Sequence, residues 1–141
     1  MMMKLTNWTP QVLSVVRIMS SLLFIEHGTQ KLFGFPAPSA RGVAEILSLM
    51  GFQGCLETFG GILLAMGFQT RIVAFLLSGE MAVGYFMVHA PHSFYPILNN
   101  GIAAVLYCFI FLLFVFSGGG AWSIDRILGW DPVQPGREVP A

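Results

Sequence analysis

Several side chains in long apolar stretches of the sequence can carry charge or exchange a proton, and five of them are candidates for an intramembrane polar site: Arg17, His27, Lys31, Glu57 and Glu80. A charged side chain at the centre of a membrane helix costs about 2.5–3.5 kcal/mol on insertion scales, so such residues need partners or a function. The depth of each residue along its helix predicts two polar pairs. We expect Arg17 to meet Glu80, and Glu57 to meet His27 or Lys31.

These pairs have two interpretations. In the first, which we favour, they form a structural clasp that fixes the order of the helices and does no chemistry. In the second, they line a polar pocket that exchanges protons or faces a quinone, because a histidine beside a carboxylate exchanges protons near neutral pH and can hydrogen-bond a carbonyl. Glu26 lies on the opposite face of its helix from Arg17, and the sequence assigns it no partner.

The composition indicates that the helices carrying these residues lie in a lipid bilayer. Of 141 residues, 55% are hydrophobic and 10% are charged, and the mean hydropathy is +0.73, which excludes an ordinary soluble domain. Seven basic and seven acidic residues cancel without forming a basic stripe, which leaves nucleic-acid binding unsupported. A membrane span needs about 20 apolar residues. Four stretches meet that requirement: 11–31, 51–68, 71–89 and 97–117.

The sequence therefore predicts an all-α, integral membrane four-helix bundle, with a single domain over residues 1–130 and a flexible tail over 131–141. Helical spacing after Pro36 and Pro38 predicts a short helix on the membrane surface between the first two spans. The short connection at 67–71 makes spans two and three an antiparallel hairpin. The positive-inside rule places both termini in the cytoplasm. The basis is a count of basic residues on each side of the membrane. One side has four, Lys4, Arg71, Arg126 and Arg137, and the other side has two, Lys31 and Arg41.

No metal or cofactor motif is recognised in the sequence. Cys55 and Cys108 lie far apart without a CxxC pattern, and we interpret them as small buried apolar residues. His89 and His92 flank Pro91 without a cysteine or carboxylate beside them, which favours exposed loop histidines over a metal site. Phosphate-binding loops and hydrolase or zinc-protease motifs are also missing from the sequence.

Three segments together resemble the DoxX family of small bacterial membrane proteins. They are Arg17 followed by EHGTQKLFGF, then ETFGGILLAMGFQTR, and finally GGGAWSIDRILG. The resemblance extends over about residues 12–128. Carried over by position, the family pattern highlights Arg17, His27, Gly28, Lys31, Glu57, Gly60, Gly61, Trp122 and Asp125. Glu80 is not matched to that pattern, so its role depends on the physical argument alone.

The resemblance implies a four-span protein of the bacterial cytoplasmic (inner) membrane. Some members of the family are described as small subunits of a terminal quinol oxidase or of a thiosulfate:quinone oxidoreductase, and others as membrane partners in thiol-stress complexes. We therefore expect an accessory or quinone-linked subunit of a membrane redox complex, which is not an enzyme on its own. The expected partners are the lipid bilayer, other membrane subunits and a second copy of the chain, with a quinone as the cofactor implied. A non-catalytic assembly subunit and a small transporter remain as alternatives.

Overall fold

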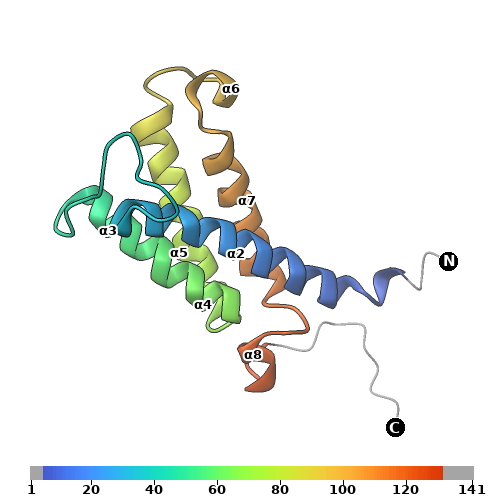
Figure 1. Ribbon diagram of the computed structural model, residues 1–141. Helices are drawn as coiled ribbons and strands as arrows, with labels where there is room; N and C mark the ends of the chain where they lie inside the picture. The colour runs from blue at the N-terminus through green and yellow to red at the C-terminus, as the bar shows by residue number, and fades with distance from the viewer. Residues whose placement is uncertain (1–4, 132–141) are drawn as a thin grey trace, which may run out of the picture.

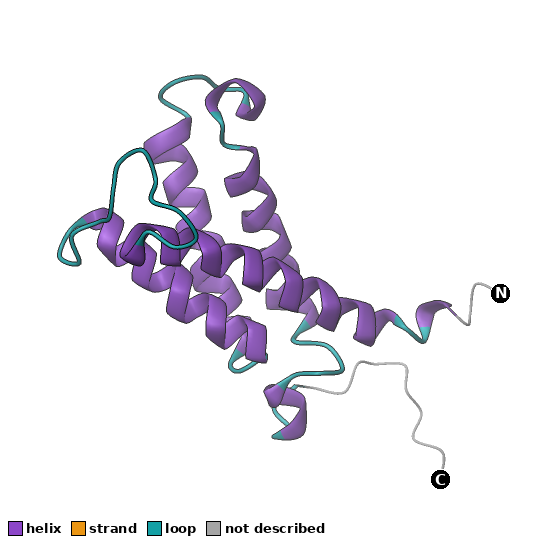
Figure 2. Cartoon of the chain, viewed as in Figure 1, coloured by secondary structure: helices purple, strands orange, loops and turns teal. Residues whose placement is uncertain are grey.

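The computed structural model describes residues 5–131, and within that range the chain is helical, with turns and no strand (Figures 1 and 2). The helices are α2 (Thr9–Phe33), α3 (Leu49–Cys55), η1 (Leu56–Gly60), α4 (Gly61–Met66), α5 (Thr70–Gly84), η2 (Tyr85–His89), α6 (Pro96–Asn99), α7 (Ile102–Ser117) and α8 (Ile124–Ile127). The predicted all-α membrane bundle is confirmed. Except for Asp131, the predicted tail at 131–141 lies outside the described residues.

Three continuous helical stretches are long and apolar enough to cross a membrane: Thr9–Phe33, Leu49–Met66 and Thr70–His89. The fourth apolar helix, α7, is shorter than the predicted stretch at 97–117. The difference arises at Asn100, whose φ of 58° ends α6, and at Gly101, after which α7 begins. A left-handed residue breaks the pattern of helical hydrogen bonds even where the sequence stays apolar.

The predicted surface helix between the first two spans is wrong. Residues 34–48 form turns, and α3 begins only at Leu49, where the side chain of Ser48 accepts a hydrogen bond from the Gly51 amide at 3.0 Å. Gly34 and Gly42 have φ values of 68° and 73°, which a helix does not tolerate. The apolar spacing in this segment therefore does not correspond to a helix face.

The helices are arranged as two pairs that meet around a small core. In the first pair α2 lies along α3, η1 and α4, and in the second pair α5 lies along α7 (Figure 1). The core contains Phe24 from α2, Leu64 from α4, Leu77 from α5, and Phe111 and Phe114 from α7. Most other large apolar side chains point outward, as expected for helices whose solvent is lipid.

The predicted hairpin between α4 and α5 is confirmed. Gly67 and Gln69 both have positive φ, 68° and 49°, and reverse the chain between the two helices. This turn lies at the same end of the bundle as α8, which we call the clasp end (Figure 1). The opposite end, where α2 ends and α3 and α7 begin, we call the pocket end. The intramembrane polar residues divide between these two ends.

Candidate functional site

Arg17 is fully buried at the clasp end and binds only backbone carbonyl groups. Its Nε donates to the Gly119 carbonyl at 2.8 Å, Nη1 donates to the carbonyls of Leu64 (2.6 Å) and Ala65, and Nη2 donates to the Trp122 carbonyl at 2.6 Å. The guanidinium group therefore joins α2 to the end of α4 and to the loop before α8.

The predicted pair of Arg17 with Glu80 is wrong. The last carbonyl groups of a helix have no partner within that helix, and Leu64 and Ala65 belong to the final turn of α4. A guanidinium group satisfies several such carbonyls at once because its donors form a fixed, planar fork. Pairing by depth along the helices finds only charged partners. Arg17 instead binds carbonyl groups at the end of α4, which lie at the same depth as its guanidinium group.

Asp125 completes the clasp by capping α5. Its two carboxylate oxygens accept hydrogen bonds from the backbone amides of Gln69 and Thr70, each at 2.7 Å. The negative charge lies at the positive end of the α5 dipole and also acts on Arg17. Trp122 contributes its carbonyl group to the clasp, while its side chain is exposed. This cluster has the properties of a structural clasp.

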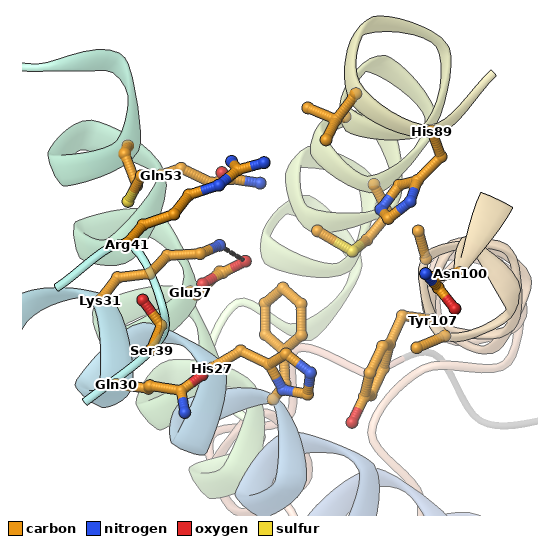
Figure 3. Close-up of a pocket in the computed structure, with 17 residues that line it drawn as sticks. His27, Gln30, Lys31, Ser39, Arg41, Gln53, Glu57, His89, Asn100 and Tyr107 are labelled. Atoms are coloured by element: carbon orange, nitrogen blue, oxygen red, sulfur yellow. Dashed lines mark hydrogen bonds and ion pairs between the residues drawn. The ribbon is translucent and has the colours of Figure 1, made fainter. Parts of the chain in front are cut away.

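The second predicted pair is confirmed at the pocket end, with Lys31 as the partner. Nζ of Lys31 lies 2.6 Å from Oε1 of Glu57, and the Glu57 side chain is 2% exposed (Figure 3). The remaining oxygen, Oε2, has no hydrogen-bond partner. Glu57 lies in η1, a single π-helical stretch inside an otherwise α-helical segment. Such insertions are frequent at functional sites because they change the direction of one side chain.

A pocket of about 320 Å³ opens beside this ion pair, between the two helix pairs. Its polar lining residues are His27, Gln30, Lys31, Ser39, Arg41, Gln53, Glu57, His89, Asn100 and Tyr107, which surround a common space in Figure 3. Its apolar lining includes Phe24, Met50, Met81 and Val88. A predominantly apolar cavity with a few convergent polar groups is the usual form of a small-molecule site.

In both histidines of the pocket, Nδ1 lies at a backbone carbonyl, which leaves Nε2 as the ring nitrogen available to a ligand. Nδ1 of His27 lies 3.0 Å from the Leu23 carbonyl, and Nδ1 of His89 lies 2.9 Å from the Asn99 carbonyl. Because a carbonyl oxygen only accepts, Nδ1 carries the hydrogen in each ring. Nε2 is then an acceptor when the ring is neutral and a donor when it is protonated. The His27 ring also packs edge-on against Tyr107, with centroids 5.8 Å apart.

His89 is therefore not the exposed loop histidine that the sequence suggested. It is the last residue of η2, and its ring contributes to the pocket. Arg41, Gln53 and Tyr107 were also missed as pocket residues. Their residue types give no sign of a pocket. For Gln53 and Tyr107, a common level along the packed helices was the one available signal, and Arg41 lies in the 34–48 loop, where helix geometry gives none.

The carboxyl group of Glu80 lies inside the bundle. Both carboxyl oxygens are buried, and neither has a hydrogen-bond partner among the described residues. Glu26, by contrast, is exposed on α2. The cysteines, Cys55 and Cys108, are both free and partly buried. No group of three or more metal-ligating side chains occurs within residues 5–131.

The family glycines keep the helices close enough to form the pocket. A Cβ atom at Gly28 would overlap Thr58 Oγ1 and would lie 2.8 Å from the Gly54 carbonyl oxygen. A Cβ at Gly61 would lie 2.6 Å from a carbon of Ile25, and a Cβ at Gly60 would lie 2.8 Å from a carbon of Leu77. Gly28 and Gly61 therefore join α2 to the second helical stretch, and Gly60 joins that stretch to α5.

Comparison with known proteins agrees with the motifs that surround these residues. The family model described as DoxX matches residues 12–90, which include Arg17, Lys31, Glu57 and Glu80. The chain belongs to the DoxX family.

Two relatives extend the similarity over most of this DoxX-family chain. An uncharacterized protein of Haemophilus influenzae is 42% identical over 129 residues, covering 89% of this chain and 96% of the relative. The inner membrane protein YqjF of Escherichia coli K12 is 29% identical over 127 residues, covering 81% of this chain and 89% of the relative. No solved structure matches. The chain is thus a membrane protein with an inner-membrane homologue.

Proposed function

We propose that this protein is an accessory subunit of a redox complex in the bacterial inner membrane, and that its pocket binds the head group of a quinone or quinol. The observation that carries the proposal is the pocket itself, in which the Lys31–Glu57 ion pair and two histidines surround a cavity of about 320 Å³. That volume is at the lower end of the range of about 300–1,000 Å³ for small-molecule sites.

The polar groups of the pocket fit both redox forms of such a ligand. Nε2 of a neutral His27 or His89 accepts a hydrogen bond from a quinol hydroxyl, and Nε2 of the protonated ring donates to a quinone carbonyl. Lys31 provides a further donor. The ring of the ligand would lie against Phe24 and Met81, since both face the same cavity. A bound quinone would supply two-electron, two-proton redox chemistry.

The pocket residues bind and exchange protons, and their side chains do not supply electrons. The proposal therefore includes a partner subunit that carries a redox cofactor, and copurification from native membranes tests it. We expect a larger complex that contains haem or flavin. An isolated chain in gentle detergent, without such a partner, would contradict the accessory role.

Binding is tested with the purified protein in nanodiscs, titrated with a short-chain ubiquinone and with its quinol. We expect saturable binding that His27→Ala weakens about tenfold, which corresponds to about 1.4 kcal/mol and to the loss of one hydrogen bond. His92→Ala is the matched control, because His92 is an exposed histidine outside the pocket lining. Absence of saturable binding, or equal weakening by both substitutions, would contradict the proposal.

A further inference from the structure

Glu57 and Glu80 face one another where the second helical stretch packs against α5. A Cβ atom at Gly60 would lie 2.8 Å from Leu77 Cδ2, and a Cβ atom at Gly84 would lie 3.6 Å from Nε2 of Gln53. The two helices are antiparallel, so positions that lie between these two contacts on one helix are opposite positions that lie between them on the other. Glu57 follows Gln53 by one turn and Glu80 follows Leu77 by one turn, so both glutamates lie at that level.

The two carboxyl groups leave three oxygens without partners in a buried place. Oε1 of Glu57 is bound by Lys31, but Oε2 of Glu57 and both oxygens of Glu80 have no hydrogen bond. The charges of Glu57 and Lys31 both act on Glu80. Buried polar atoms are nearly always hydrogen-bonded, so three orphaned oxygens on facing side chains require an explanation.

The charges around this interface determine which glutamate is ionised. The other titratable or charged side chains that line the pocket beside Glu57 are Lys31 and His27 on α2, Arg41 in the 34–48 loop, His89 in η2 and Tyr107 on α7. The ammonium group of Lys31, 2.6 Å from Oε1, keeps Glu57 as the carboxylate. A second carboxylate facing it would be repelled by Glu57, and no cation is in contact with Glu80 among the described residues.

We propose that Glu57 and Glu80 form a proton-binding site, in which Glu80 is a neutral carboxylic acid that donates a hydrogen bond to Oε2 of Glu57. The proton satisfies one oxygen of each side chain and leaves the group of Lys31, Glu57 and Glu80 electrically neutral. Glu57 lines the pocket and Glu80 does not. A proton that moves from the oxygen of Glu80 to Oε2 of Glu57 therefore reaches a side chain that lines the cavity, and this step does not depend on which ligand the pocket binds.

Infrared spectroscopy of the purified protein without any quinone tests this site. At neutral pH the wild type should show the carbonyl-stretch band of a protonated carboxylic acid, which shifts in D₂O. Glu80→Gln should abolish the band, and Glu26→Gln, at an exposed glutamate on α2, should leave it unchanged. A wild-type spectrum without the band, or a band that survives Glu80→Gln, would overturn the proposal.

Glu57→Gln provides an independent readout if Glu80→Gln does not fold. Since Glu80 would then donate to an amide oxygen instead of a carboxylate, its band should move to a higher frequency. An unmoved band would overturn the pairing. Removal of the proton at alkaline pH sets two anions against each other, so the wild type should lose thermal stability there and Glu80→Gln should not. Equal pH dependence of the two proteins would also contradict the site.

Discussion

Arg17 links three segments of the chain through one side chain, and its replacement tests the clasp. Arg17→Met leaves the carbonyls of Leu64, Gly119 and Trp122 buried without a donor. We expect the free energy of unfolding to fall by on the order of 3 kcal/mol or more. Arg17→Lys should recover only part of this loss because an ammonium group is not a planar fork.

The unfolding of the two Arg17 variants is measured in detergent against Arg126→Met, which removes an exposed arginine on α8. The control should remain close to the wild type. If Arg17→Met and Arg126→Met were equally stable, the clasp would have no role in the fold.

Asp125 contributes to stability through the start of α5. Asp125→Ala removes the acceptor for the amides of Gln69 and Thr70, and loss of such a cap costs about 0.5–2 kcal/mol. Asp125→Asn should lie between the wild type and Asp125→Ala, since one acceptor oxygen remains but the charge is lost. Chemical denaturation followed by circular dichroism measures the order of the three proteins. An order with Asp125→Asn lowest would contradict capping as the cause.

The sequence indicated which charged residues are buried in the bundle more reliably than it indicated their partners. The partner of Glu57 was narrowed to His27 or Lys31 by depth and charge, and Lys31 is the one that forms the ion pair. Arg17 was matched wrongly, because its partners are backbone carbonyls and these carry no signal in residue type. The pocket histidine at position 89 was missed for a related reason: its role depends on η2 extending the third helical stretch to that residue.

The contact between α2 and η1 depends on Gly28, and two glycine substitutions separate packing from helix propensity. Gly28→Ala places a Cβ against Thr58 and the Gly54 carbonyl, and overpacking of this kind costs about 1–3 kcal/mol. Gly79→Ala is the matched control, because a Cβ there meets nothing within 4 Å. Because alanine replaces a glycine in the middle of a helix, Gly79→Ala should raise the free energy of unfolding by about 0.5–1 kcal/mol.

Thermal unfolding in detergent compares the two glycine variants, and opposite shifts of the midpoint are expected. Because His27 precedes Gly28 and Glu57 precedes Thr58, Gly28→Ala should also weaken binding of the quinone analogue. A Gly28→Ala protein as stable as Gly79→Ala would show that the helices do not need this close approach.

Elements with a regular pattern were predictable, and their interruptions were not. The boundaries of the first three helical stretches lie close to the predicted spans because long apolar runs determine them. The segment at 34–48 has apolar residues at helical spacing, yet it forms turns and bends, and its two glycines, Gly34 and Gly42, have positive φ. The π-helical turns also depend on tertiary packing, so periodicity alone gives no indication of them.

The placement of the whole protein in the membrane is testable with cysteine labelling. Arg71 and Arg126 lie at the clasp end, and Lys31 and Arg41 lie at the pocket end. The positive-inside rule then predicts a cytoplasmic clasp end, with four spans and both termini on that side. In a chain whose native cysteines are replaced by serine, Ser39→Cys should react with a membrane-impermeant thiol reagent on intact spheroplasts. Arg126→Cys should react only after permeabilisation, and the reverse result would invert the topology.

The π-helical turn η1 also affects how distant relatives are aligned. It accommodates one residue more than the α-helix around it, so deletion of a single residue within 56–60 would restore regular winding and rotate the preceding positions by about 100° relative to the following ones. The carboxylate of Glu57 and the glycine contact at Gly61 would then no longer lie on the faces that they now occupy. A one-residue gap at this point in a homologue thus identifies a protein without this ion pair, even where the glutamate itself is retained.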